Sequence, residues 1–116
     1  MKNHKMEVIL FVCNHGYAYE AMTEARKAGA RGGTIIHGRS SISTEKEKFL
    51  GITLHPEKDI LLIVCLAEQK NVLMKAMTAK YGVTTEARGL CFSMPVSDAI
   101  GFSFEPIPFP KEKQQS

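Results

Sequence analysis

The sequence consists of two similar halves, and this repeat constrains the fold more than any other feature. An acidic residue, an apolar run and a cysteine follow one another at 7–13 (EVILFVC) and again at 59–65 (DILLIVC), fifty-two positions later. Each run leads into a segment with helical spacing of apolar residues that ends at a glycine, and a second apolar run follows. Two tandem strand–helix–strand units predict an α+β, ferredoxin-like βαββαβ fold, with a four-stranded antiparallel sheet and two helices on one face.

Hydrophobic periodicity gives each element a range. The predicted strands lie at 6–13, 32–38, 58–66 and 89–95, the last ended by Pro95, and the predicted helices lie at 16–28 and 68–81. Gly29 is expected at the C′ position of the first helix, and Gly82 is expected to end the second. The apolar faces of the two helices should be formed by Ala18, Ala21, Met22, Ala25 and Ala28, and by Val72, Leu73, Ala76, Met77 and Tyr81.

Three segments fall outside the repeat. Residues 39–48 are mostly polar, and 49–54 then has the character of a short strand or a tucked arm. Residues 101–104 alternate between glycine or serine and phenylalanine, which predicts an edge strand. At 116 residues the chain is one domain. We assign it to 1–105, followed by a partly disordered tail at 106–116 that is rich in proline and lysine.

The predicted sheet has one face that no helix covers. The runs at 8–13 and 60–66 are so continuously apolar that they place Leu, Ile and Val on both faces of the sheet. An apolar face of that size should not remain in water. We therefore expect self-association through the sheet into a closed ring, which creates clefts between subunits.

Composition argues against several classes of protein. A net charge of +3 without a basic run does not indicate nucleic-acid binding. The polar start does not resemble a signal peptide, and no stretch reaches the roughly 20 apolar residues of a membrane span. The three cysteines, Cys13, Cys65 and Cys91, lie in apolar runs and are expected to be buried, reduced thiols of a cytoplasmic protein.

Three blocks of sequence resemble the nitrogen regulatory P-II superfamily. They are AGARGGT at 28–34, the strand at 59–66, and GLCFSMPVSDAI at 89–100, in the family's order and spacing. The resemblance implies a ferredoxin-like homotrimer that binds adenine nucleotides in clefts between subunits. It also implies a mobile loop after the second strand that contacts a partner protein in a ligand-dependent way.

Residues of the P-II site carry over to eight positions. Thr34 matches the threonine on the adenine side of the family's site. The start of the mobile loop matches Gly38, Arg39, Ser40 and Ser41. The phosphate-binding turn matches Ala87, Arg88 and Gly89. The chain departs from the family at Leu90, where the family has a lysine, and at Gly101 and Ser103, where it has two arginines. The family's loop tyrosine is also missing. Because charge-assisted contacts contribute about 1.5–3 kcal/mol each, these losses favour a smaller or less charged anion than a triphosphate.

The expected function is therefore that of a cytoplasmic, P-II-like signalling homotrimer rather than an enzyme. A small anionic effector, an adenine nucleotide by resemblance, would act through its preference for one state of the segment 39–54. That segment would regulate a partner, a transporter or an enzyme. No cofactor, resident metal, nucleic acid or membrane insertion is expected.

Three alternatives remain open at this point. The trimeric CutA family shares the fold, and a relative of it would bind a divalent metal at Cys13, His15 or His37. An enzyme would need a nucleophile with a base, and only Cys13 with His15 approaches that arrangement. An interaction module without a small ligand would explain Gly101 and Ser103.

Overall fold

The four main strands form a single antiparallel sheet. The computed structural model describes residues 5–41, 48–49, 52–53 and 56–101. The strands of the sheet are β1 (Met6–Asn14), β2 (Thr34–Arg39), β5 (Glu57–Leu66) and β6 (Leu90–Val96). They are arranged in the order β2-β5-β1-β6.

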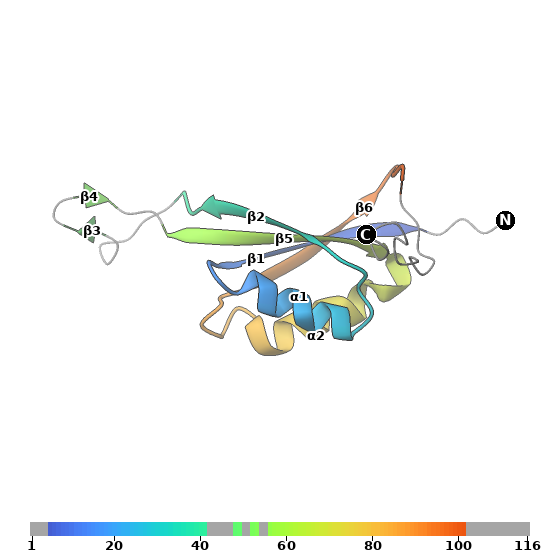
Figure 1. The fold of residues 1–116 in the computed structure, drawn as a ribbon, viewed down its shortest axis with the longest axis horizontal. Coiled ribbons are helices and arrows are strands. Elements are labelled where there is room, and N and C mark those ends of the chain that lie inside the picture. The colour runs from blue at the N-terminus through green and yellow to red at the C-terminus, as the bar shows by residue number, and fades with distance from the viewer. Residues whose placement is uncertain (1–4, 42–47, 50–51, 54–55, 102–116) are drawn as a thin grey trace, which may run out of the picture.

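Two helices cover one face of this sheet (Figure 1). They are α1 (Ala18–Lys27) and α2 (Lys70–Tyr81), the latter entered through the 3₁₀ turn η2 (Ala67–Gln69). The order of elements and the strand order confirm the predicted ferredoxin-like, α+β fold. Within the described residues, no helix is long and apolar enough to cross a membrane.

The core lies between the helices and the sheet. The alternation along β1 and β5 buries Ile9, Phe11, Leu61 and Ile63 completely against the helices. From α1 the predicted residues Ala18, Ala21, Met22 and Ala25 are buried, and small side chains there let the helix approach the sheet closely. Gly29 adopts φ +117°, the left-handed conformation expected after a helix.

Helix α2 differs from its prediction at one position. Leu73 and Met77 are buried, but Val72 is 57% exposed. Successive residues of a helix are about 100° apart, so Val72 lies to one side of the narrow stripe that Leu73 and Met77 form.

The face of the sheet away from the helices is apolar along all four strands. The strand register places its side chains in three rows that cross the sheet. The first row is Val64, Val8 and Met94, and the second is Thr34, Leu62, Leu10 and Phe92. The third row is Ile36, Ile60, Val12 and Leu90. We call these residues the open face, which is the upper face in Figure 1. Among them Ile36, Leu90, Phe92 and Met94 are each at least 40% exposed. Among the described residues, the predicted apolar face is therefore present and no helix covers it.

Several boundaries differ from the predictions by one or two residues: β2 begins at Thr34 instead of 32, α1 at Ala18 instead of 16, and α2 at Lys70 instead of 68. Strand β6 runs through Pro95, which pairs with Glu7, instead of ending there. This is possible because β6 is an edge strand and needs hydrogen bonds on one side only. Between β2 and β5, β3 (Lys48–Phe49) pairs with β4 (Ile52–Thr53) as a short hairpin, at the position of the expected strand or arm.

The C-terminal predictions fall largely outside the described residues. Gly101 belongs to no strand, and 102–104 of the predicted edge strand and the tail at 106–116 are not described.

Candidate functional site

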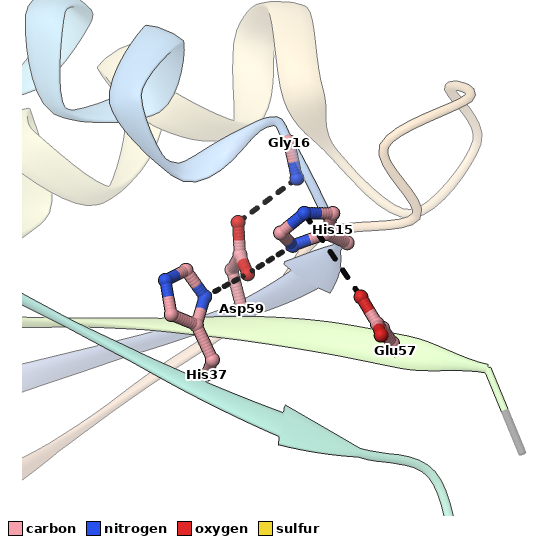
Figure 2. A network of polar contacts seen from close by, with 5 residues as sticks. All are labelled: His15, Gly16, His37, Glu57 and Asp59. Atoms are coloured by element: carbon pink, nitrogen blue, oxygen red, sulfur yellow. Dashed lines mark hydrogen bonds and ion pairs between the residues drawn. The ribbon is translucent and has the colours of Figure 1, made fainter.

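Two histidines and an aspartate meet at one end of the sheet. Nδ1 of His15 lies 2.9 Å from Oδ1 of Asp59, and Nδ1 of His37 lies 2.8 Å from the same oxygen. The two imidazole centroids are 5.5 Å apart. Figure 2 shows the carboxylate between the two rings, with its second oxygen turned toward Gly16. We call His15, His37 and Asp59 the histidine–aspartate cluster.

Three elements position this cluster. Asp59 lies on the helix-facing side of β5, opposite His37 in β2 and opposite Cys13 in β1. His15 follows the end of β1, in the turn that enters α1. Gly16 in that turn has φ +102°, which suits glycine, and its N–H donates to Oδ2 of Asp59 at 2.9 Å. The antiparallel register of three neighbouring segments therefore fixes the meeting point.

The cluster holds its carboxylate in the ionised state. Burial of Asp59, which is 2% exposed, would by itself raise its pKa. Hydrogen bonds from Gly16 and the two imidazoles outweigh burial and lower the pKa of Asp59 to about 2. The same contact raises the pKa of His15. A stable negative charge therefore sits beneath two exposed imidazoles.

A hollow of about 420 Å³ adjoins the cluster. Gly38, Arg39 and Glu57 line it together with the two histidines. Two predicted ligand residues, Gly38 and Arg39, thus lie beside side chains that can bind a cation or donate to an anion. Ser40 continues the β2–β5 ladder through a 2.8 Å bond from its N–H to Pro56 O, and Ser41 is exposed next to it.

The predicted phosphate turn, Ala87 to Gly89, reaches the same end of the sheet. Ala87 O accepts a 2.8 Å hydrogen bond from the N–H of Asn14 at the end of β1. The three N–H groups of the turn donate to Thr85 Oγ1, Thr85 O and Gly82 O. The predicted contact between these N–H groups and an anion is therefore not available in this conformation. Arg88, with φ 51° and an exposed side chain, can still supply its guanidinium.

Thr34 lies apart from the other predicted ligand residues. It begins β2, four positions before Gly38, and at about 3.3 Å per residue the two are roughly 13 Å apart. Its own hollow, about 170 Å³, is lined by Gly32, Gly33, Leu62 and Val64. One chain does not bring Thr34 together with Arg39 or Arg88.

Comparisons with solved structures place the fold among known proteins. No protein-family model and no curated protein matches this sequence. Arabidopsis thaliana PII bound to citrate matches with TM-score 0.64 at 19% identity, over 84% of this chain and 81% of that one. The Bacillus subtilis GlnK–ATP complex matches with TM-score 0.62 at 13% identity, over 80% and 84%. The chain has a divergent P-II-like fold.

A second type of protein has a similar structure. CutA from Synechococcus elongatus matches with TM-score 0.58 at 10% identity, over 81% of this chain and 79% of that one. At these identities the comparisons establish the fold of this chain, and its ligand must be argued from its own residues.

Sequence reasoning missed Asp59 as a site residue. In the repeat Asp59 is the equivalent of Glu7, and the sequence alone connects neither His15 nor His37 with it. The available signal was an acidic residue directly before eight apolar ones, a position where a charged side chain is unusual unless it is paired. Cys13, by contrast, is buried in the core, and its burial and the nearby Asp59 raise its pKa to about 11. It is not among the groups in the described residues that could share a metal ion.

Proposed function

We propose that this chain is a P-II-like regulatory protein that forms a homotrimer through its open face. Three or more apolar side chains stand in each row of that face, and β6 adds the exposed Leu90, Phe92 and Met94. Leaving such a surface in water is unfavourable, at about 25 cal/mol for each Å² that a partner subunit would cover. The open face is the observation that carries the proposal.

We further propose a small anionic effector, an adenine nucleotide or a similar anion, in the clefts between subunits. Arg39 and Arg88 supply positive charge from β2 and from the turn before β6. Thr34 lies on the open face, where the proposed trimer would bring it to a neighbouring copy rather than to its own Arg39. A complete site would therefore combine Gly38 to Ser41 and the Arg88 guanidinium, from the turn Ala87 to Gly89, with Thr34 of the next subunit.

Regulation would pass through the segment 39–54 to a partner protein, a transporter or an enzyme. This segment leaves the sheet where Gly38 and Arg39 line the hollow, so an effector bound there touches the base of the segment. An effector shifts the segment only if it binds one of its states more tightly than the other.

Sedimentation velocity and titration calorimetry test this function. We expect a species of three times the 12.9 kDa chain mass and saturable binding of at least one of ATP, ADP, AMP or a cyclic nucleotide. A monomer at micromolar concentration would overturn the trimer. Flat titrations with all four nucleotides would overturn the nucleotide effector.

The second candidate is a CutA-like, divalent-metal-binding trimer. The histidine–aspartate cluster favours it, because two imidazoles and a carboxylate are suitable metal ligands. Elemental analysis of protein purified without added metal separates the two. Retained stoichiometric metal in a protein that binds no nucleotide would favour the second candidate.

A further inference from the structure

We propose that Nδ1 of His15, Nδ1 of His37 and Oδ1 of Asp59 bind one divalent transition-metal ion at the base of the 39–54 segment. The proposal goes beyond the nucleotide-sensing function and does not depend on it. The three ligands come from the turn after β1, from β2 and from β5, all within a single chain. A metal site here would therefore exist even in a monomer.

The ligand atoms already converge. All three lie within 4.8 Å of one another, and both nitrogens lie within 2.9 Å of the shared oxygen (Figure 2). In a tetrahedral zinc site with bonds of about 2.0–2.1 Å, neighbouring ligands are about 3.3 Å apart. To reach that geometry the two rings must withdraw from Asp59 by about half an ångström, and their nitrogens must approach each other from a separation of up to 4.8 Å. Exposed imidazoles can make both adjustments by side-chain rotation.

The surroundings also fit a metal site. The Gly16 N–H holds Oδ2 of Asp59 and so leaves Oδ1 directed at the two rings. When Nδ1 of His15 binds a metal, its proton is on Nε2, and that nitrogen lies 4.0 Å from Oε1 of the exposed Glu57. A small rotation of Glu57 would give this N–H a carboxylate acceptor. Metal-binding histidines usually have such a partner.

The donor set selects the kind of ion. Two imidazole nitrogens and one carboxylate oxygen suit Zn²⁺, Co²⁺, Ni²⁺ or Fe²⁺, whereas Mg²⁺ and Ca²⁺ prefer oxygen ligands throughout. Three protein ligands leave positions for water, and the hollow of about 420 Å³ beside the histidines has room for it. The alternative is that Asp59 and the histidines only tie β5 to β2 and to the turn after β1, in which case no metal should bind.

Titration of the full chain with Zn²⁺ and Co²⁺, without nucleotide, tests the site. We expect one ion per chain and a visible Co²⁺ absorption band, with Mg²⁺ giving no signal. His37→Ala and Asp59→Asn should each weaken Zn²⁺ binding at least a hundredfold, and Glu57→Gln about tenfold. His4→Ala is the matched control, since it removes an imidazole outside the cluster and should leave the titration unchanged.

Absence of saturable Zn²⁺ and Co²⁺ binding would overturn the proposal, as would binding that His37→Ala leaves intact. Because a misfolded variant would also lose metal binding, a second measurement uses the unaltered chain. Imidazole ¹⁵N spectra should show Zn²⁺ shifting the Nδ1 signals of His15 and His37 and not those of His4. Equal shifts on all histidines would indicate non-specific binding and refute the site. None of these readings depends on trimer formation or nucleotide binding, so failure here leaves the nucleotide-sensing function standing and removes only the second, metal-binding candidate.

Discussion

Leu10 lies directly opposite Leu62 in the pairing of β1 with β5, and these residues hold equivalent positions in the two halves of the sequence. The local two-fold axis that relates the halves therefore passes between them. As a result the acid of each half lies opposite the cysteine of the other, Glu7 opposite Cys65 and Asp59 opposite Cys13. The repeat in the sequence is thus a symmetry of the sheet.

The two ends related by this axis have different chemistry. Glu7 lies 3.8 Å from Nζ of Lys70, an ordinary ion pair at the start of α2. Asp59 instead contacts two histidines beside a hollow. A duplicated framework thus carries the candidate site at one end only.

Phe92→Glu should break self-association. Phe92 lies on the open face and is 40% exposed, so a charge there would be buried without a partner in an assembled sheet. We expect sedimentation velocity to show a monomer. Val72→Glu, at a 57% exposed apolar residue on α2, should leave the assembly intact. Equal effects of both substitutions would contradict an interface on the open face.

Arg39→Ala and Arg88→Ala should each weaken binding of the anionic effector by about 10- to 100-fold, the loss of one charge-assisted contact. Titration calorimetry with the tightest-binding nucleotide measures this. Arg26→Ala is the control, because Arg26 is exposed in the last turn of α1, away from both residues in the sequence. Unchanged affinity in both test variants would remove these arginines from the site.

Gly89→Ala should destabilise the fold even in the absence of any ligand. A Cβ there would overlap Tyr81 O and the Phe11 ring, so the core must shift. Overpacking of this kind costs about 1–3 kcal/mol in the free energy of unfolding, measurable by urea denaturation. Gly38→Ala is the matched control, since a Cβ at Gly38 meets nothing within 4 Å. Similar stabilities would show that the packing around Gly89 is looser than described.

The cluster should make stability depend on pH in a metal-free buffer. Because the pKa of Asp59 is lowered from 3.8 to about 2, its contribution is present above pH 4 and is lost as the pH falls toward 2. The raised pKa of His15 acts in the opposite direction, and its contribution is lost as the pH rises through that raised value. Solvent screening at the exposed imidazoles limits the Asp59 contribution to about 1–2 kcal/mol.

Urea unfolding of the wild type and of Asp59→Asn measures this effect at fixed protein concentration. The difference between them should be largest near pH 5 and smaller at pH 2.5. A difference that does not change with pH would contradict the ionised carboxylate.

The thiols should react slowly in the folded protein. Burial raises the pKa of Cys13 and of Cys91 to about 11, so at pH 8 only about one thiol in a thousand is ionised. Mass spectrometry after iodoacetamide treatment should show the half-buried Cys91 modified first and all three cysteines modified together in urea. Rapid labelling of Cys13 in the native protein would indicate that this end of the core opens.

The elements with strong periodicity could be predicted from sequence. The alternating burial of β1 and β5 and the alanine face of α1 follow from the residues themselves, because each side chain's environment repeats with the element. The continuation of β6 through Pro95 to Val96 could not be predicted in this way. Whether Pro95 is tolerated depends on β6 lying at the sheet edge, which only the tertiary structure determines.

The candidate site could be predicted only in part. Gly38 and Arg39 were placed by resemblance, and they do line a hollow. The cluster was not predicted, because His15, His37 and Asp59 are each 22 positions from the next, and their contact depends on the register of β2 with β5 and of β5 with β1. Neither register is visible in a single sequence.

The last residue pairs between β2 and β5 fix where the intervening segment is attached to the domain. Arg39 pairs with Glu57 and Ser40 bonds Pro56, so the chain leaves and re-enters the domain at two adjacent points that the framework holds together. Sequence inserted between those points would start from a fixed pair of attachment points, and connections of this kind tolerate insertion and replacement during evolution.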